Sequence, residues 1–288
     1  MIEHFALNTP AGSFDAIGAG PGDGPGVLFL HGFPEAATEW EDQLSALGSA
    51  GYRAVAVDQR GYSPGVRPAA VADYRMESLC ADVLAFADAL HWPLFDLVGH
   101  DWGAAVAWRL AAVMPQRLHS LTAISVPHPA AFAVALAEDA DQQRRSAYLR
   151  LFRAPGGVAE DTLLADDAAK LRAIYDGRVP SWRVQEYLHR LREPGALTAA
   201  LNWYRAMTPM GDTPTVRIPT LYIFSTADDA LGPAAAHATA AHVSGPYRFE
   251  VLDGVSHWVP EEAADIVSSL LLEHLGNRTP RRIDADAG

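Results

Sequence analysis

A short run with an acidic side chain between two glycines is the most chemically suggestive part of this sequence. It reads Gly99-His100-Asp101-Trp102-Gly103 and follows Phe95–Val98, which has the character of a short buried strand. Glycines on both sides permit a tight, strained turn that presents the central side chain at the end of a sheet. A helical pattern follows at once, and its small residues Ala104 and Ala105 allow close packing. We therefore predict a strand, a sharp turn and a helix, with Asp101 presented at the turn.

The aspartate at this turn determines which reactions are available. Serine is the commoner residue at such a turn and must lose a proton before it attacks, whereas a carboxylate is already ionised near neutral pH. Asp101 can therefore displace an alkoxide or a halide from a saturated carbon and form an ester with itself. A base is then free to activate water, which cleaves the ester. The residue type thus predicts a two-step substitution through a covalent intermediate.

Two groups that could assist Asp101 follow in the chain order nucleophile, acid, histidine. The apolar run Thr220–Phe224 leads to Asp228 and Asp229, and a carboxylate just past a strand end can reach the catalytic face. We select Asp228 as the acid and keep Asp229 as the alternative. His257 follows another expected strand and precedes a helical pattern, which places it on a loop beside the turn. We expect His257 to take a proton from water while the acid orients its ring.

The early loop His31–Glu35 is expected to supply a backbone hydrogen-bond donor. It follows the short apolar run Val27–Leu30, and a loop after an early strand provides one oxyanion-hole amide in this type of site. The residue after the nucleophile provides the other amide. We therefore assign these roles to the N–H groups of Phe33 and Trp102, which would stabilise the oxyanion formed when water attacks the Asp101 ester.

Other reactive side chains are interpreted as structural. His31 and His100 lack a third ligand at a helpful spacing, so we expect no metal site, and no motif requires an organic cofactor. Cys80 is the single cysteine, which excludes an internal disulfide, and we expect it to pack as a small apolar residue. Because a proline follows Phe33, a cis peptide bond between Phe33 and Pro34 is one option.

The composition is that of an ordinary globular protein and narrows the classes of partner. The 288 residues are 49% hydrophobic and 20% charged, with a formal net charge of −13. This charge disfavours nucleic acid as a partner, because phosphate binding needs a basic face. The N-terminal segment lacks a signal-peptide pattern, and no apolar segment reaches the length of a membrane-spanning helix. Together with the single cysteine, these features favour a cytoplasmic location, and a homodimer is left open.

Short apolar runs alternate with helical patterns, which predicts a mostly parallel sheet covered on both faces. The expected strands are Val27–Leu30, Arg53–Asp58, Phe95–Val98, Leu121–Ile124, Thr220–Phe224 and Phe249–Leu252, and the expected helices are Glu39–Ala50, Met76–Leu90, Ala104–Met114 and Glu261–Leu275. Residues 128–215 show helical patterns without a convincing strand, so we predict a helical cap inserted into a core of residues 1–127 and 216–276. The polar segment 277–288 is expected to be a disordered tail.

Several motifs together resemble those of a known enzyme family. The loop HGFPE at 31–35, the turn GHDWG at 99–103 and the late run GVSHW at 254–258 are similar to those of the epoxide hydrolases of the alpha/beta-hydrolase superfamily. The resemblance extends to the cap within the core and covers nearly the whole chain. It implies the alpha/beta-hydrolase fold and a reaction in which water opens an epoxide to a vicinal diol through the Asp101 ester, without a cofactor.

The resemblance also assigns roles to residues of the cap. In epoxide hydrolases two cap tyrosines hold the epoxide oxygen and donate a proton to the alkoxide, which is a poor leaving group without one. The segment Leu201–Arg205 resembles the second-tyrosine segment, which assigns that role to Tyr204, and Tyr148–Gly156 is more loosely similar to the first, which assigns Tyr148. The implied substrate is a small apolar epoxide in contact with Phe33, Trp102, Trp203 and Trp258.

Two other functions fit some of the same residues. Haloalkane and haloacid dehalogenases share the motifs outside the cap, and the indole N–H groups of Trp102 and Trp203 could bind a halide. Against this function, Phe33 stands where haloalkane dehalogenases usually carry a polar residue, and the paired tyrosines would have no task. The other function is that of a degenerate hydrolase that binds a small ligand as a sensor or carrier, and the complete catalytic set argues against it.

Overall fold

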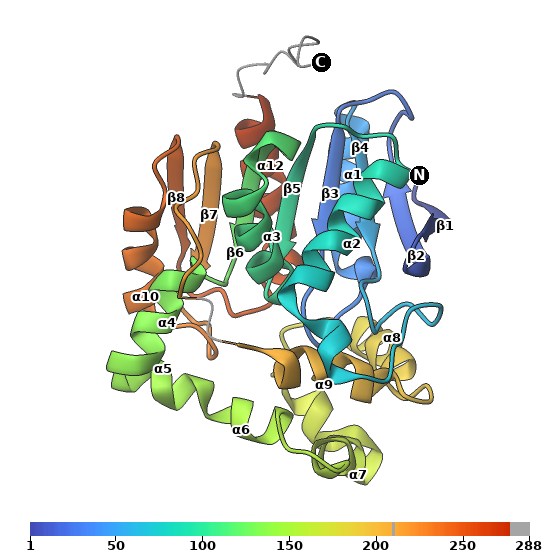
Figure 1. Cartoon of the computed structure of the whole chain (residues 1–288), viewed down its shortest axis with the longest axis vertical. Helices are drawn as coiled ribbons and strands as arrows, with labels where there is room; N and C mark the ends of the chain where they lie inside the picture. Colours follow the sequence, from blue (N-terminus) through green and yellow to red (C-terminus); the bar gives the residue numbers. More distant parts are fainter. Residues whose placement is uncertain (209–210, 277–288) are drawn as a thin grey trace.

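The computed structural model describes residues 1–208 and 211–276, so the tail predicted for residues 277–288 lies outside the described part. Eight strands form one sheet in the order β1-β2-β4-β3-β5-β6-β7-β8 (Figure 1). Neighbouring strands from β4 to β8 are parallel, which confirms the predicted mostly parallel sheet. The strands are β1 (Glu3–Thr9), β2 (Gly12–Ala19), β3 (Gly26–Leu30), β4 (Arg53–Val57), β5 (Phe95–His100), β6 (Leu118–Ile124), β7 (Thr220–Ser225) and β8 (Tyr247–Leu252).

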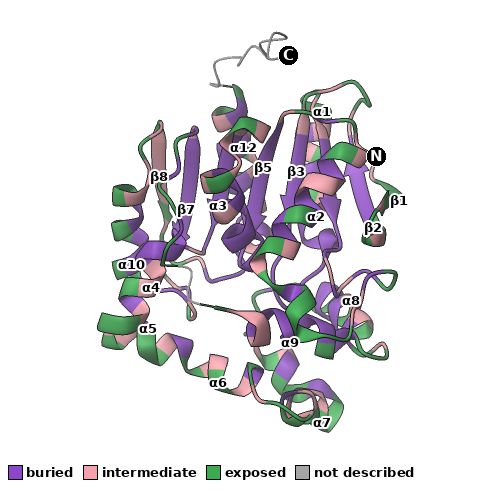
Figure 2. Ribbon diagram, viewed as in Figure 1, coloured by how far each residue is buried: buried purple, intermediate pink, exposed green. Residues whose placement is uncertain are grey.

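The central strands are buried because helices cover both faces of the sheet. Every residue of β5 and of β7 is buried. One apolar cluster lies between the sheet and helices α2 (Met76–Ala89) and α3 (Trp102–Val113), and a second lies under α1 (Glu41–Ser49) and α12 (Ala264–Gly276). Figure 2 shows burial along the strands and exposure on the outer sides of the helices. Burial on both faces explains why these strands appear in the sequence as short, mainly apolar runs.

The edge formed by β1 and β2 was not predicted from the sequence. Both strands pair in the antiparallel sense, β1 with β2 and β2 with β4. In β1 only Leu7 is buried, and most of its neighbours are exposed. A strand with one buried residue gives almost no apolar signal, which is why the sequence pattern did not identify it.

The strand order changes direction between β3 and β5. The chain continues from β3 to β4 on one side, and from β5 through β6, β7 and β8 on the other. Open α/β sheets bind ligands in the crevice at such a point, beyond the carboxyl ends of the strands. The segments that follow β3 and β5 carry Phe33 and Asp101. The fold therefore brings two of the predicted site residues to the usual place for a ligand.

The described part of the segment between β6 and β7 contains helices and no named strand. The helices are α4 (Pro129–Glu138), α5 (Ala140–Arg145), α6 (Leu149–Phe152), α7 (Val158–Ala173), α8 (Ser181–Leu191) and α9 (Ala196–Ala206). In Figure 1 they lie below the sheet and cover the end that carries the crevice. α4 begins with Pro129, whose fixed φ suits a first helical turn, and the His128 ring accepts a hydrogen bond from the Ala130 N–H. We keep 128–215 as the proposed bounds of the cap.

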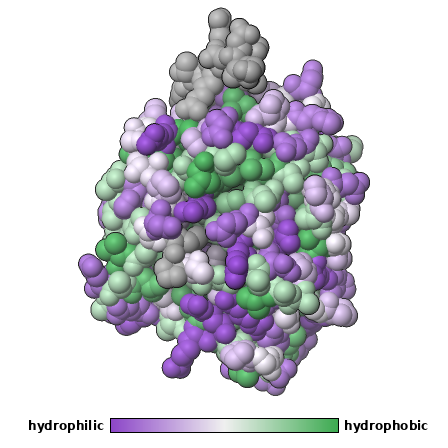
Figure 3. Space-filling model, viewed as in Figure 1, coloured by the Kyte–Doolittle hydropathy of each residue, from purple (hydrophilic) through white to green (hydrophobic). Residues whose placement is uncertain are grey.

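The surface gives little sign of a special environment. Hydrophilic and hydrophobic residues are interspersed on the face shown in Figure 3. Such mixing is normal for a globular protein, because apolar atoms contribute much of any folded surface. Among residues 1–208 and 211–276, no helix combines the length and the apolar character needed to span a bilayer.

Candidate active site

Asp101 lies at the sharp turn between β5 and α3, where the Gly-x-Asp-x-Gly pattern predicts it. Its backbone has φ 48° and ψ −118°, a conformation that residues other than glycine rarely adopt. A Cβ at Gly99 would lie 2.3 Å from the carbonyl oxygen of Gly103, and a Cβ at Gly103 would lie 2.1 Å from that of Leu30. Neither position has room for a side chain. The two glycines therefore allow the strained turn that holds the carboxylate at the end of the sheet.

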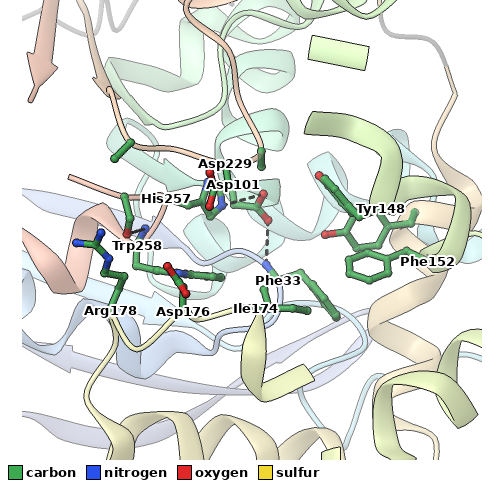
Figure 4. A pocket seen from close by; sticks show the side chains of 14 residues that line it. Phe33, Asp101, Tyr148, Phe152, Ile174, Asp176, Arg178, Asp229, His257 and Trp258 are labelled. Atoms are coloured by element: carbon green, nitrogen blue, oxygen red, sulfur yellow. Dashed lines mark hydrogen bonds and ion pairs between the residues drawn. The ribbon is translucent and has the colours of Figure 1, made fainter. Parts of the chain in front are cut away.

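The two carboxylate oxygens of Asp101 have different neighbours. Oδ1 accepts a hydrogen bond of 2.9 Å from the N–H of Phe33, one of the two backbone donors expected from the sequence. Oδ2 lies 3.5 Å from Nε2 of His257, and Figure 4 shows the carboxylate between these groups. Burial opposes ionisation, but the hydrogen bond and the charge of His257 outweigh burial and hold the pKa of Asp101 below its ordinary value. Asp101 is therefore ionised and ready to act as a nucleophile.

His257 lies between two carboxylates. Its Nδ1 donates a hydrogen bond of 2.8 Å to Oδ2 of Asp228. Oδ1 of Asp228 accepts hydrogen bonds from the N–H groups of Ala230 at 2.7 Å and Leu231 at 2.9 Å, which hold the acid in place. Burial alone would lower the pKa of His257, but Asp228 and Asp101 together raise it well above its ordinary value. In the free protein the imidazole is therefore charged.

Of the two aspartates after β7, only Asp228 is placed against the histidine. Asp228 is 1% exposed, whereas the neighbouring Asp229 is exposed and lines the cavity described below. The guanidinium of Arg145, in helix α5 of the cap, donates to the backbone carbonyl of Asp228. The geometry therefore favours Asp228 over Asp229 as the acid, and it links the acid loop directly to the cap.

Tyr148 and Tyr204 reach the nucleophile from the cap. Tyr148 immediately precedes α6, and Tyr204 lies in α9. Their ring centroids are 6.3 Å apart, and both residues line a cavity of about 420 Å³ together with Asp101 and His257. Burial raises the pKa of both hydroxyls above the ordinary value of tyrosine, so both carry their protons near neutral pH. The fold thus brings two proton donors to the cavity that contains an ionised carboxylate.

Three of the four aromatic residues expected to touch substrate line a cavity, and one does not. Phe33 and Trp258 line the large cavity, and Trp102 lines a smaller one beside it. Trp203 lines neither, because its indole N–H donates to the carbonyl of Arg60 at 2.8 Å and its ring packs edge-on against Trp102. The structure therefore gives no support to the expectation that Trp203 contacts substrate, because this side chain is buried and lines neither cavity.

A cluster of three glutamates behind His257 was missed in the sequence, with Glu35 and Glu39 buried and Glu261 partly buried. His100 connects them to the catalytic loop, because its Nε2 donates to the carbonyl oxygen of His257 at 2.9 Å. Its Nδ1 lies 3.1 Å from Oε2 of Glu35 and 3.5 Å from Oε2 of Glu39. Burial, followed by the neighbouring carboxyl groups, raises the pKa of Glu35 to about 8 and that of Glu261 to about 9. Glu35 and Glu39 are close in the chain, but His100 and Glu261 are far from them in sequence, so no local pattern could have identified the cluster.

This cluster also corrects the expectation that His100 lacks nearby metal ligands. One ligand atom each from Glu35, Glu39 and His100 lie within 4.8 Å of one another. Metal ligation requires deprotonated carboxylates. Burial raises the pKa of both glutamates, to about 8 for Glu35, which disfavours their charged forms. We interpret the set as a support for the loop that carries His257, because His100 donates to the carbonyl oxygen of His257.

The remaining sequence expectations concern residues around the loop after β3. His31 is fully buried, and its Nδ1 donates to the Gly32 carbonyl at 2.8 Å while its Nε2 accepts from the Gln59 N–H at 3.1 Å. Both ring nitrogens are thus used in holding the loop, as a structural role requires. The Phe33–Pro34 peptide is cis, and Cys80 is a buried free cysteine.

Known proteins resemble this chain over nearly its whole length. A family model described as alpha/beta hydrolase fold matches residues 25–264. The chain is 35% identical to the AB hydrolase superfamily protein YfhM of Bacillus subtilis, over 94% of this chain and 97% of that protein. It is 32% identical to epoxide hydrolase A of Mycobacterium tuberculosis, over 90% of this chain and 92% of that protein.

Solved structures show the same relationship. An epoxide hydrolase from hot-environment metagenomes superposes with a TM-score of 0.87 at 29% identity, covering 96% of this chain and 100% of that one. Epoxide hydrolase A from Mycobacterium thermoresistibile gives a TM-score of 0.85 at 27% identity, covering 98% of this chain and 100% of that one. The sequence, the sheet topology and these relatives agree. The chain therefore belongs to the alpha/beta-hydrolase superfamily, and its relatives there include epoxide hydrolases.

Proposed function

We propose that this hydrolase opens epoxides with water and forms vicinal diols through a covalent ester on Asp101. One observation carries the proposal: an ionised Asp101 lines the same cavity as the protonated hydroxyls of Tyr148 and Tyr204, with His257 beside it. Opening an epoxide requires attack on carbon and a proton for the oxygen, and these groups supply both. Relatives named epoxide hydrolases, including that of Mycobacterium tuberculosis, support the same reaction.

In the first step, Asp101 attacks one carbon of the epoxide ring. Oδ2 is the attacking oxygen, because Oδ1 is held by the Phe33 N–H. A bond forms between Oδ2 and this carbon while the bond from the carbon to the epoxide oxygen breaks, and its electron pair stays on that oxygen. Tyr148 or Tyr204 donates the proton that this oxygen needs. The product is an ester of Asp101 with a hydroxyl group on the adjacent carbon.

In the second step, water attacks the carbonyl carbon of the ester. Nε2 of His257 takes a proton from the water, and the negative charge develops on Oδ1, to which the Phe33 N–H donates. The N–H of Trp102, the first residue of α3, is the proposed second donor. When the ester bond breaks, His257 returns its proton to the departing alkoxide. The carboxyl proton then restores the tyrosine, and the diol leaves.

The first step prepares His257 for the second. While Asp101 and Asp228 are both ionised, the pKa of His257 is raised well above its ordinary value and the ring is charged. Esterification removes the negative charge of Asp101, so burial acts against the charged ring with only Asp228 to oppose it. The pKa of His257 therefore falls once the ester forms. The ring therefore releases its proton to water before the second step, so that a neutral imidazole is available to activate the attacking water. It takes up a proton from water again once Asp101 regains its negative charge.

The proposal is tested by a single turnover of styrene oxide with enzyme in excess, in water enriched in oxygen-18. We expect mass spectrometry to find one labelled oxygen in the Asp101 carboxyl group, while the first diol carries an unlabelled oxygen from the enzyme. Asp101→Ala should lower diol formation by a factor on the order of 10⁴ or more. Asp42→Ala, an exposed carboxylate on α1, is the matched control. Label that enters the diol directly would contradict the covalent route.

Assays of halide release, diol formation and binding distinguish the two alternative functions from epoxide hydrolysis. Dehalogenation is less well supported, because the Trp203 N–H is bound to the Arg60 carbonyl and cannot hold a halide. Halide release from simple haloalkanes without diol formation from epoxides would nevertheless favour it. A sensor or carrier would bind an epoxide without producing diol.

A further inference from the structure

Two cavities of very different size meet at the nucleophile. The larger has a volume of about 420 Å³ and the smaller about 60 Å³. Asp101, Tyr148 and Tyr204 line both, so the cavities adjoin at the groups that hold and attack the epoxide. The substituents on the two ring carbons of a bound epoxide therefore face spaces of unequal capacity.

The smaller cavity suits a compact apolar group. Apart from the three shared residues, its lining is apolar and includes Ala105 in α3, Phe132 in α4 and Met207 after α9. Its volume of about 60 Å³ is about one seventh of the 420 Å³ of the larger cavity. A methyl group gains from burial in such a space, whereas a phenyl ring has far more room in the larger cavity.

The larger cavity accepts an extended group and leads outward. Near the nucleophile its walls are aromatic, with Phe33, Phe152 and Trp258. Farther along, Asp176 and Arg178 line it, and both are exposed, so this part of the cavity opens toward water (Figure 4). Its volume lies within the range of about 300–1,000 Å³ that is usual for small-molecule sites. An apolar group beside the ring and a longer, hydrated end both have a place here.

We propose that the enzyme prefers epoxides with one extended substituent on one ring carbon and only hydrogen or methyl on the other. This preference rests on the proposed function and adds the class of substrate to it. The extended substituent occupies the aromatic-walled cavity, and the hydrogen or methyl faces Phe132 and Met207. Epoxides with two large substituents are disfavoured, because whichever way they bind, one large group faces the small cavity.

Three substrates that differ only at the second ring carbon test the preference. They are styrene oxide, trans-β-methylstyrene oxide and trans-stilbene oxide, which carry hydrogen, methyl and phenyl there. We expect kcat/KM to be similar for the first two and at least about tenfold lower for the third, a discrimination typical of an apolar pocket. Equal kcat/KM for all three would overturn the preference and leave the proposed function intact. Absence of diol from every epoxide would instead refute the proposed function.

Variants separate the effect of cavity size from the intrinsic reactivity of the substrates. Phe132→Ala enlarges the small cavity, so the ratio of kcat/KM for stilbene oxide to that for styrene oxide should rise at least about fivefold. Met207→Ala tests the same wall from another segment and decides the question if the first variant does not fold. Val134→Ala, on the same helix but 56% exposed, is the matched control and should keep the parent ratio. An unchanged ratio in folded cavity variants would overturn the proposal.

Discussion

Tyr204 is held by more aromatic neighbours than Tyr148. Its ring centroid lies 5.4 Å from that of Phe33, 5.1 Å from that of Trp102 and 5.0 Å from that of Phe152. Among the aromatic contacts recorded in the described residues, Tyr148 meets only Phe152 and Tyr204. Aromatic pairs in edge-on arrangements restrict ring motion and favour one orientation. Tyr204 is therefore the more firmly held of the two proposed proton donors.

Tyr204→Phe should slow formation of the ester on Asp101 and leave its hydrolysis nearly unchanged. The variant keeps the ring packing but removes the hydroxyl, so the alkoxide has only Tyr148 as a donor. We expect the first step to slow by about 10²-fold, the lower end for loss of a general acid. Pre-steady-state measurement of the two steps checks this, with Tyr247→Phe on β8 as the control. Equal slowing of both steps would contradict the assigned role.

Asp228→Asn should slow hydrolysis of the ester more than its formation, which is the opposite of the effect expected for Tyr204→Phe. The negative charge of Asp228 raises the pKa of His257, so its removal lowers that pKa and weakens the orientation of the ring. Attack by Asp101 does not need a neutral histidine, whereas activation of water does. We expect ester hydrolysis to slow by about 10²–10⁴-fold, so that the ester accumulates. Mass spectrometry of the intact protein after mixing with substrate detects it, and a variant without accumulated ester would refute the assignment.

At the scale of elements, the sharp turn between β5 and α3 depends on backbone contact with the neighbouring strand. Gly103 packs against the end of β3, where a Cβ would lie 2.1 Å from the Leu30 oxygen and 2.8 Å from the His31 oxygen. Both obstacles are backbone atoms in a buried sheet, so neither can move without disturbing the loop that carries Phe33. The turn that carries Asp101 and the loop that carries Phe33 are thus coupled through these backbone contacts.

Gly103→Ala should therefore reduce both stability and activity. Overpacking of this kind costs roughly 1–3 kcal/mol, which corresponds to a fall in Tm of several degrees for a protein of this size. Displacement of Phe33 should also lower the rate of ester hydrolysis. Thermal unfolding and single-turnover assays measure the two effects. Gly22→Ala is the control, since nothing lies within 4 Å of its added Cβ, and equal behaviour of the two variants would contradict the contact.

Local patterns predicted most of the parallel strands and the helices that follow them. The helix expected at Met76–Leu90 is observed as Met76–Ala89, and the strand expected at Thr220–Phe224 as Thr220–Ser225. The helix expected from Glu39 begins at Glu41, because Ala37–Trp40 forms a 3-10 turn instead. Elements with mixed exposure were harder, as β1 shows. Apolar periodicity reports burial, so it predicts little where burial is partial.

The residues of the candidate site also differ in how readily the sequence predicts them. Asp101 and His257 could be chosen because chain order and turn chemistry place them at neighbouring strand ends. The direction of Trp203 could not, since it depends on how α9 packs against the loop that carries Arg60. The glutamate cluster was also beyond local patterns, because only tertiary structure brings Glu35 and Glu39 to His100 and Glu261 to Glu35. The position of the backbone therefore follows from sequence more readily than the direction of a side chain or the contacts between charged groups that are distant in the chain.

At the scale of the whole molecule, the glutamate cluster lies where the cap meets the core. The Tyr187 hydroxyl of α8 donates to Glu261 at 2.9 Å, and the Tyr175 hydroxyl donates to the Pro34 carbonyl at 2.7 Å. Arg183 of α8 pairs with Glu41 of the core at 2.6 Å. The charge state of this cluster therefore affects how the two parts of the chain hold together.

Glu39→Gln should stabilise the protein more at pH 8 than at pH 5. Burial raises the folded pKa of Glu39 well above 4.5, so above about pH 4.5 the folded form keeps a proton that the unfolded form loses. Stability therefore falls as pH rises through this window, and glutamine removes the titration. We expect a rise in Tm of roughly 2–4 °C at pH 8, equivalent to about 1 kcal/mol. Glu77→Gln, exposed on α2, is the control, and a gain independent of pH would refute the argument.

The cap separates the nucleophile from its acid and base along the chain, and this order matters during synthesis. The ribosome delivers Phe33 and Asp101 first, then the helices from α4 to α9, and only afterwards Asp228 and His257. Under the proposed mechanism, the residues that release the ester are therefore the last part of the site to be synthesised.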